Sequence, residues 1–262
     1  MSEYDMGGIG DMAFASGYDE RQPVVILLDT SDSMGRPDDR PRIDELNAAL
    51  VRWFDGVRSQ ERLRERVEVC LIAFSSQVRV YDPGEGRLVP AGSAAADRLF
   101  VPAREMHPPA LTADGYTQLI PAVETALTLA RERCAALRAQ CVPVRRPFIW
   151  ALTDGAPSDA EGEPQGADEL AVTAGLLSRA EAGGECVFQA IGVRGADRRM
   201  LEVLAPKGTS MLESLDFGQI LDHLFTSSDK VDPTQSADEI HRVVASMAAL
   251  RQQMNAMSDD LL

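Results

Sequence analysis

The chain has 262 residues, a length that fits one large domain or two small ones and allows a sizeable buried core. Apolar residues make up 45% of the chain and charged residues 26%, which is an ordinary globular composition. The 41 acidic residues outnumber the 26 basic ones, and the resulting net charge of −15 disfavours binding to nucleic acid or to an anionic membrane surface. We therefore expect a globular protein with no nucleic-acid or membrane partner.

The N-terminal segment and the cysteines bear on where the protein is located and on whether it contains a zinc site or disulfides. Residues 1–20 contain five acidic residues and no Lys or Arg, so we predict a flexible acidic arm and no secretory signal, and we expect a cytoplasmic protein. The four cysteines form no CxxC pair and no cluster with histidine, which argues against a zinc site or a disulfide framework.

From residue 21 onward, apolar β-branched runs alternate with segments of helical periodicity, and we assign residues 21–228 to one domain. The predicted strands are 23–28, 67–74, 77–81, 147–153, 185–193 and 210–215, with a short strand near 98–101. The predicted helices are 43–57, 117–139, 168–182, 196–204 and 217–225. The run 23–28 is apolar without interruption, as in a parallel strand buried on both faces. This alternation predicts a doubly wound α/β fold with a mainly parallel sheet.

Residues 229–262 are predicted to form a separate helical tail. Its apolar residues are spaced alternately by three and four positions, which is a heptad pattern. These residues are Ile240, Val243, Met247, Leu250, Met254, Met257 and Leu261. Two interpretations stay open: a helix packed back on the domain, or a surface at 236–261 for a partner helix or a second copy of the chain.

Polar residues follow two of the predicted strands at the end where ligands bind in doubly wound folds. Asp29 ends the first strand and is followed by Ser31 and Ser33, while Asp154 ends the strand 147–153. Thr117 opens the long helix and is expected at the same edge. These side chains offer oxygen ligands without His or Cys, which suits a hard cation such as Mg²⁺, with Mn²⁺ or Ca²⁺ as alternatives. Because few carboxylates oppose the cation, it would seek an anionic ligand from a partner.

The same residues resemble the metal-ion-dependent adhesion site of von Willebrand factor A domains. The resemblance covers residues 21–225 and rests on Asp29-x-Ser31-x-Ser33, on Thr117 and on Asp154 in Thr-Asp-Gly. It looks most similar to the bacterial TerY-type branch, which is associated with tellurite resistance, stress and defence. It implies a six-stranded sheet with one antiparallel edge strand, and Mg²⁺-dependent binding of an Asp or Glu supplied by a partner protein.

Two features depart from this pattern or compete with it. Asp32 stands where the family usually has Gly, and its carboxylate could join the metal site or weaken the attraction for an anionic ligand. Thr112 is a competing hydroxyl for the position of Thr117. Each motif also has a simpler interpretation, since Asp29 or Thr117 could only cap a helix and Asp154 could only form a turn.

Other functions are weighed against the adhesion site. Phosphatases of the haloacid dehalogenase type need a second Asp two residues after the first, and Ser31 occupies that position here. No phosphate-binding or nucleophile motif is present, so we expect no enzyme and no catalytic residues. A structural adaptor, in which the metal only stabilises loops and the tail contacts the partner, is the main alternative.

Overall fold

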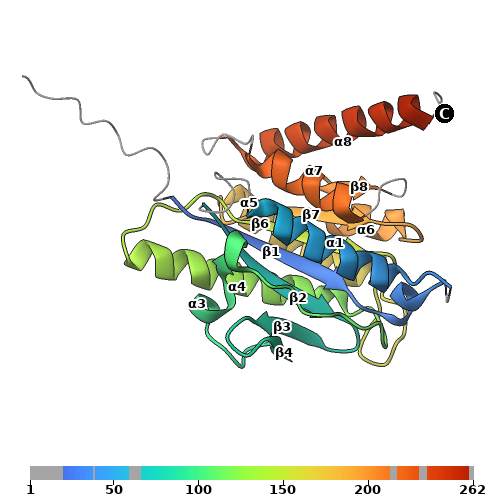
Figure 1. Cartoon of the computed structure of the whole chain (residues 1–262), viewed down its shortest axis with the longest axis horizontal. Coiled ribbons are helices and arrows are strands. Elements are labelled where there is room, and N and C mark those ends of the chain that lie inside the picture. Colours follow the sequence, from blue (N-terminus) through green and yellow to red (C-terminus); the bar gives the residue numbers. More distant parts are fainter. Residues whose placement is uncertain (1–19, 38, 59–65, 213–216, 230–234, 260–262) are drawn as a thin grey trace, which may run out of the picture.

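The computed structural model describes residues 20–37, 39–58, 66–212, 217–229 and 235–259. It contains one eight-stranded sheet between two layers of helices (Figure 1). The acidic arm predicted at 1–20 lies outside the described residues except for Glu20, which pairs with Arg145 at 3.0 Å. None of the described helices is long and apolar enough to cross a membrane.

The sheet is mainly parallel in its centre and antiparallel at one side. Its order is β4-β3-β2-β1-β6-β7-β8, and β5 pairs with β2 beside this path. β1 pairs in parallel with both β2 and β6, and the pairs β6–β7 and β7–β8 are also parallel. The strands are β1 (Gln22–Asp29), β2 (Val67–Phe74), β3 (Val78–Asp82), β4 (Arg87–Pro90), β5 (Val101–Pro102), β6 (Phe148–Thr153), β7 (Val187–Gly192) and β8 (Thr209–Met211).

This architecture confirms the predicted fold class, but the sheet has eight strands and not the six that the resemblance implies. β5 covers only the end of the short strand expected near 98–101, because residues 96–99 form a helix, and β4 is an additional strand. The chain reverses into β4 at a turn where Asp82 accepts hydrogen bonds from the backbone of Gly84 and Glu85. β5 pairs with the start of β2 at Glu68 and Val69, an edge that β3 leaves open because it pairs only with the end of β2. β4 has four residues and is too short to give a periodic signal.

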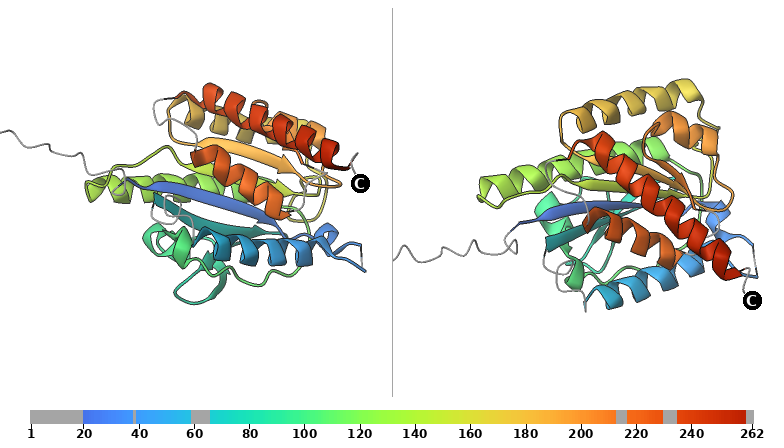
Figure 2. Two further views of the ribbon diagram at one scale, coloured as in Figure 1. Left: turned by 45° about the horizontal axis from the view of Figure 1, so that its top comes forward. Right: turned by 90° about the horizontal axis from the view of Figure 1, so that it is seen from above.

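Helices cover both faces of the sheet (Figure 2). α1, α7 and α8 pack on one face, and α3, α4, α5 and α6 on the other. The predicted helices are all present; α4 begins two residues later than expected, and α7 extends to residue 229. The helices are α1 (Arg42–Val57), α3 (Ala96–Leu99), α4 (Leu119–Ala139), α5 (Ala167–Ala182), α6 (Arg198–Leu204), α7 (Phe217–Asp229) and α8 (Ala237–Asp259), with short 3₁₀ turns η1 (Asp32–Gly35) and η2 (Ala103–Glu105).

β1 is buried along its whole length because it lies in the middle of the sheet. Val24, Ile26 and Leu28 belong to the core beneath α1 and α7, while Val25 and Leu27 belong to the core beneath α4. Side chains alternate between the two faces of a strand, so an uninterrupted apolar run supplies both cores at once. This fixes the position of Asp29 at the end of the run.

An aromatic cluster joins α1, α7 and β6. The rings of Trp53 and Phe225 stack with centroids 3.7 Å apart, and Trp150 meets Phe225 edge to face at 4.6 Å. Phe225 is 1% exposed and lies between the two tryptophans. It therefore attaches α7 to the sheet and to α1.

The first half of α8 packs back on the domain. Ile240 and Val244 are buried in the core beneath α7. The His241 imidazole contacts the Glu181 carboxylate of α5 at 2.8 Å and the Gln189 side chain of β7 at 3.3 Å. The packed interpretation therefore holds for this half. The side chains of Leu250, Met254, Met257 and Leu261 lie outside the described residues, so the partner interpretation of the second half stays a prediction.

Phe225→Ala is expected to lower the free energy of unfolding by about 3–5 kcal/mol, because it empties the space between two tryptophans. Urea unfolding followed by tryptophan fluorescence measures this change. Val51→Ala is the control: Val51 lies on α1 but is 50% exposed, so a change within about 0.5 kcal/mol is expected. Equal effects of the two substitutions would contradict the described packing of α7.

Candidate functional site

The candidate site lies where the strand order reverses. β2 and β6 flank β1 on opposite sides, so the carboxyl ends of β1 and β6 are neighbours at the switch point of the sheet. This is the place where doubly wound folds bind ligands. Asp29 is the last residue of β1, and Asp154 directly follows β6. Three loops surround this edge, residues 30–36, 113–118 and 154–159, and we refer to them as the site loops.

The Asp29 carboxylate is fully buried at the centre of the edge. It accepts hydrogen bonds from the Ser31 backbone N–H at 2.8 Å and from the Thr153 hydroxyl at 2.5 Å. Burial raises the pKa of Asp29 to about 6; these hydrogen bonds oppose part of the rise, and the neighbouring Asp154 adds to it. The ionised form of Asp29 is therefore disfavoured by burial unless a cation lies nearby.

The two serines connect Asp29 to Asp154. The Ser31 and Ser33 hydroxyl oxygens are 3.0 Å apart, and the Ser33 hydroxyl donates to the Asp154 carboxylate at 2.6 Å. Ser31 and Asp154 are 2% and 3% exposed, so these oxygens converge in a nearly dry place. Alternate residues of the first site loop therefore point to the same region, as their spacing predicts.

Thr117 reaches the same region from the second site loop. Its backbone N–H donates to the Ser158 hydroxyl at 2.8 Å, and the Ser158 N–H donates to the Thr117 carbonyl at 2.9 Å. A Cβ atom placed on Gly155 would lie 3.2 Å from the Thr117 hydroxyl oxygen and 3.6 Å from that of Ser33. The absence of a side chain at Gly155 lets both hydroxyl groups face the same space.

Backbone hydrogen bonds join the first two site loops directly. The Asp32 N–H donates to the Gly115 carbonyl at 2.9 Å, and the Asp114 N–H donates to the Thr30 carbonyl at 2.8 Å. Gly115 has a φ of +75°, a conformation that glycine adopts readily and other residues rarely do. The loops are therefore held together by main-chain contacts.

Arg42, at the start of α1, brings a positive charge into contact with the site. Its Nη1 donates to the Asp154 carboxylate and, at 3.1 Å, to the Ser33 carbonyl. The sequence motifs do not indicate Arg42, because its contact with Asp154 depends on how α1 packs against the site loops. The available signal was a cation at a helix N-terminus, where the helix dipole disfavours positive charge.

The structure thus brings together Asp29, Ser31, Ser33, Thr117 and Asp154, the five residues predicted from the sequence. Asp32 and the competing Thr112 are both exposed, and Asp32 enters the hydrogen-bond network through its backbone. Thr153 and Ser158, which hold Asp29 and Thr117, were not predicted as site residues. Both lie within four residues of Asp154 in the sequence, and this proximity was the only signal.

The donor set consists of carboxylate and hydroxyl oxygens. In the described part of the chain, no group of three or more His, Cys, Asp or Glu side chains is placed to hold a metal. A site with two carboxylates and three hydroxyl groups suits neither zinc nor an iron cluster. It fits a hard cation that keeps some of its water.

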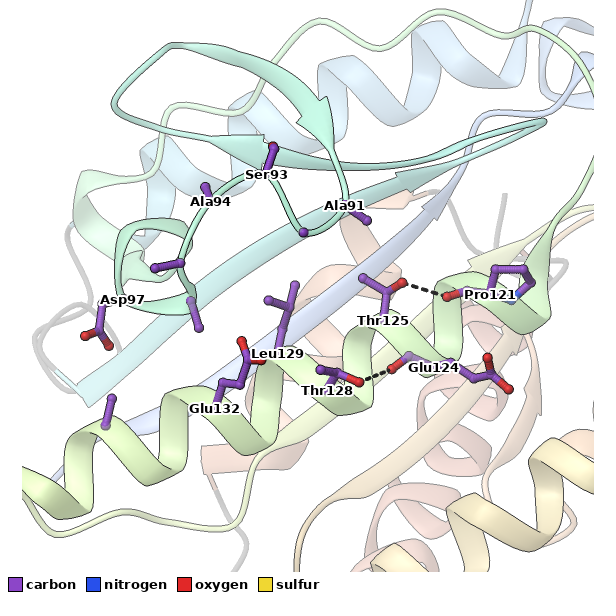
Figure 3. Close-up of a pocket in the computed structure, with 14 residues that line it drawn as sticks. Ala91, Ser93, Ala94, Asp97, Pro121, Glu124, Thr125, Thr128, Leu129 and Glu132 are labelled. Carbon is purple, nitrogen blue, oxygen red and sulfur yellow. Dashed lines mark hydrogen bonds between the residues drawn. The ribbon is translucent and has the colours of Figure 1, made fainter.

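A separate hollow of about 860 Å³ lies between α4 and the segment 91–97 (Figure 3), and the residues that line it do not belong to the site loops. Its wall on α4 carries Thr125, Thr128 and the carboxylates of Glu124 and Glu132, and the opposite wall consists mostly of alanine, glycine and serine. No histidine, cysteine or basic side chain lines it. Its titratable side chains are the carboxylates of Asp97, Glu124 and Glu132.

Comparison with known proteins identifies the type of fold. No protein-family model matches the chain, and no curated protein matches it. The von Willebrand factor domain of the type V pili tip protein Mfa5 from Porphyromonas gingivalis superposes with a TM-score of 0.50 and 11% identity, over 80% of this chain and 95% of that chain. This likeness shows a fold of the von Willebrand factor A type.

Two further solved structures are similar at lower TM-scores. A von Willebrand factor type A protein from Catenulispora acidiphila has a TM-score of 0.43 and 19% identity, over 87% of this chain. This chain spans only 43% of that protein. The manganese-loaded Plasmodium vivax TRAP protein has a TM-score of 0.46 and 16% identity, over 78% of this chain and 72% of that chain.

Gly115→Ala is expected to destabilise the protein by more than about 1 kcal/mol, because the native φ is positive. In addition, the new Cβ would lie 2.2 Å from the Ser76 hydroxyl oxygen. Gly56→Ala in α1 is the matched control. A Cβ there meets nothing within 4 Å, so alanine is expected to stabilise the helix by about 0.5–1 kcal/mol. Urea denaturation measures both, and shifts of the same sign would contradict the loop geometry.

Proposed function

We propose that this chain is a protein–protein interaction module, which binds a carboxylate of its partner through a divalent cation at the β1/β6 edge. The proposed cation ligands, direct or through water, are Asp29, Ser31, Ser33, Thr117 and Asp154. One observation carries the proposal: hydroxyl and carboxylate oxygens from three site loops converge at the switch point, and backbone contacts hold the loops in place.

The burial of the two carboxylates supports a cation at this place. Asp29 and Asp154 are almost fully buried, and buried charges are strongly disfavoured unless they are paired; Asp154 pairs with Arg42, whereas Asp29 has hydrogen bonds and no cation among its described contacts. A dication between the site loops would balance both charges, while the neutral hydroxyl groups would leave it electrophilic. Mg²⁺ is our first choice, with Mn²⁺ or Ca²⁺ as alternatives, because these ions prefer oxygen ligands. When bound, the ion would supply a position for an anionic ligand.

The partner and setting are proposed from the sequence. An Asp or Glu side chain of another protein would provide the anionic ligand, and the TerY-type resemblance suggests a bacterial stress-resistance or defence complex in the cytoplasm. The similarity to the Mfa5 domain, which belongs to a pili tip protein, agrees with an interaction role. Partner binding through the second half of α8 remains the alternative.

An enzymatic role has less support. Ser31 stands where a phosphohydrolase of the dehalogenase type needs its second Asp, and a serine hydroxyl cannot replace that carboxylate as a general acid or base. His107, which lies outside the site loops, is exposed and contacts the Glu105 carbonyl. We therefore propose a binding function without catalysis.

Adding Mg²⁺ or Mn²⁺ to metal-stripped protein is expected to raise the midpoint of thermal unfolding, because the ion binds the folded chain and not the unfolded one. At about 100 times its Kd, the ion adds about 2.7 kcal/mol, which corresponds to roughly 5–10 °C for a chain of this size. Differential scanning fluorimetry measures the shift. Thr117→Ala and Ser33→Ala should each remove most of it.

Thr128→Ala is the matched control for Thr117→Ala. The Thr128 hydroxyl donates to the Glu124 carbonyl on the exposed side of α4 (Figure 3), and Thr128 belongs to none of the site loops. Its metal-induced shift should equal that of the wild type. No shift in the wild type at millimolar Mg²⁺ and Mn²⁺, or equal shifts in all three variants, would contradict the proposed ligands.

Capture of a partner from a bacterial lysate on immobilised chain is expected to require the cation. Partner bound in Mg²⁺ should be released by EDTA and by a high concentration of free acetate, which competes for the same ion. Thr117→Ala should fail to capture it and Thr128→Ala should succeed. Capture that persists in EDTA and with Thr117→Ala would favour the adaptor alternative, in which α8 contacts the partner.

A further inference from the structure

Arg42 places a positive charge inside the candidate site. Its side chain is 21% exposed, whereas that of Asp154 is fully buried. The guanidinium donates to one Asp154 carboxylate oxygen, and the Ser33 hydroxyl donates to the other. In the described structure, Arg42 is thus the counter-ion of a carboxylate that we propose as a ligand of the divalent cation.

The position of Arg42 is unfavourable apart from this contact. Arg42 is the first residue of α1, where the N-terminal end of the helix dipole repels a cation. A buried carboxylate, in turn, needs a compensating charge. Pairing with Asp154 satisfies both groups, which explains why the guanidinium points into the site.

A divalent cation and Arg42 compete for the same carboxylate. Asp29 and Asp154 together carry two negative charges when ionised, which one dication balances. With Arg42 still on Asp154, the site would hold an excess positive charge in a nearly dry place, where repulsion between like charges is strong. The ion and the guanidinium therefore exclude one another.

A divalent cation, which has the higher charge, can replace Arg42 in its contact with Asp154. Arginine binds a carboxylate best through two parallel N–H groups, but here only Nη1 donates to Asp154. Arg42 Nε is buried without a hydrogen-bond partner. A Cβ atom placed on Gly195 would lie 3.7 Å from Arg42 Nη2, in van der Waals contact with the guanidinium.

We propose that Arg42 is a built-in competitor of the divalent cation: it neutralises Asp154 in the metal-free protein and must leave that carboxylate when the metal binds. The proposal rests on the proposed function, because it concerns the same site. It adds that the metal affinity of this chain is set by an arginine that is not a ligand, and that metal binding moves the side chain at the start of α1.

The first test compares Mn²⁺ affinities by isothermal titration calorimetry on the full chain. Arg42→Gln, which removes the competing charge, should bind Mn²⁺ at least tenfold more tightly than the wild type. Its metal-free form should unfold at a lower temperature, because Asp154 then lacks a counter-ion. Arg40→Gln is the control: Arg40 pairs with Glu45 and is 78% exposed, and its loss changes the net charge equally. Its Kd should stay within twofold of the wild-type value.

The second test uses the wild type and does not depend on the folding of a variant. Phenylglyoxal modifies accessible arginines, and peptide mass spectrometry reports the rate at each one. Saturating Mg²⁺ should accelerate modification of Arg42 several-fold and leave Arg40 unchanged. An unchanged rate at Arg42 in metal-bound protein would overturn the competition.

The outcomes separate this proposal from the proposed function. If the wild type binds Mn²⁺ and Arg42→Gln binds it no more tightly, the role of Arg42 is wrong and the metal site stands. If the wild type, Arg42→Gln and Arg40→Gln all fail to bind Mn²⁺, both the competition and the metal-dependent function are wrong. If Arg42→Gln binds Mn²⁺ more tightly than the wild type while Arg40→Gln does not, the result supports both the competition and the metal-dependent function.

Discussion

The candidate site depends on hydrogen bonds that join the three site loops at the carboxyl edge of the sheet. The backbone of Asp32 donates to the Gly115 carbonyl. The Thr117 N–H donates to the Ser158 hydroxyl, and the Ser158 N–H donates to the Thr117 carbonyl. These contacts involve no charged side chain. The loops can therefore hold their arrangement whether or not a cation is present. An ion or a partner would then bind loops that are already ordered, so binding would not have to offset the loss of their conformational entropy.

The charge of the site is balanced within the chain. Asp29 is held by hydrogen bonds from Ser31 and Thr153 and has a raised pKa, so burial already disfavours its ionised form. Asp154 instead forms an ion pair with Arg42. The two carboxylates are therefore stabilised by different means, and a divalent cation would affect them differently: it would supply a charge that Asp29 lacks and replace one that Asp154 has. Competition of this kind would make the metal-free protein stable and the metal site adjustable.

Sequence patterns predicted much of the fold because β1 and its neighbours are buried on both faces. An uninterrupted apolar run then marks the strand, and the first polar residue after it marks the edge where ligands bind. Asp29 and Asp154 were identified in this way. The short strand β4 could not be found, since its four residues carry no period, and β5 is shorter than the strand expected near 98–101. Arg42 and Ser158 act through contacts across the fold, as does His241, which secures α8 to a residue 60 positions away. Such contacts depend on packing and leave no local pattern.

The most direct measurement is anomalous X-ray diffraction from crystals of the chain soaked in Mn²⁺. The account predicts one strong manganese peak at the carboxyl ends of β1 and β6, in contact with oxygens of Ser31, Ser33 and Thr117, directly or through water. Arg42 should then be displaced from Asp154. A map without a peak at this edge, with Arg42 still paired to Asp154 at saturating Mn²⁺, would contradict it.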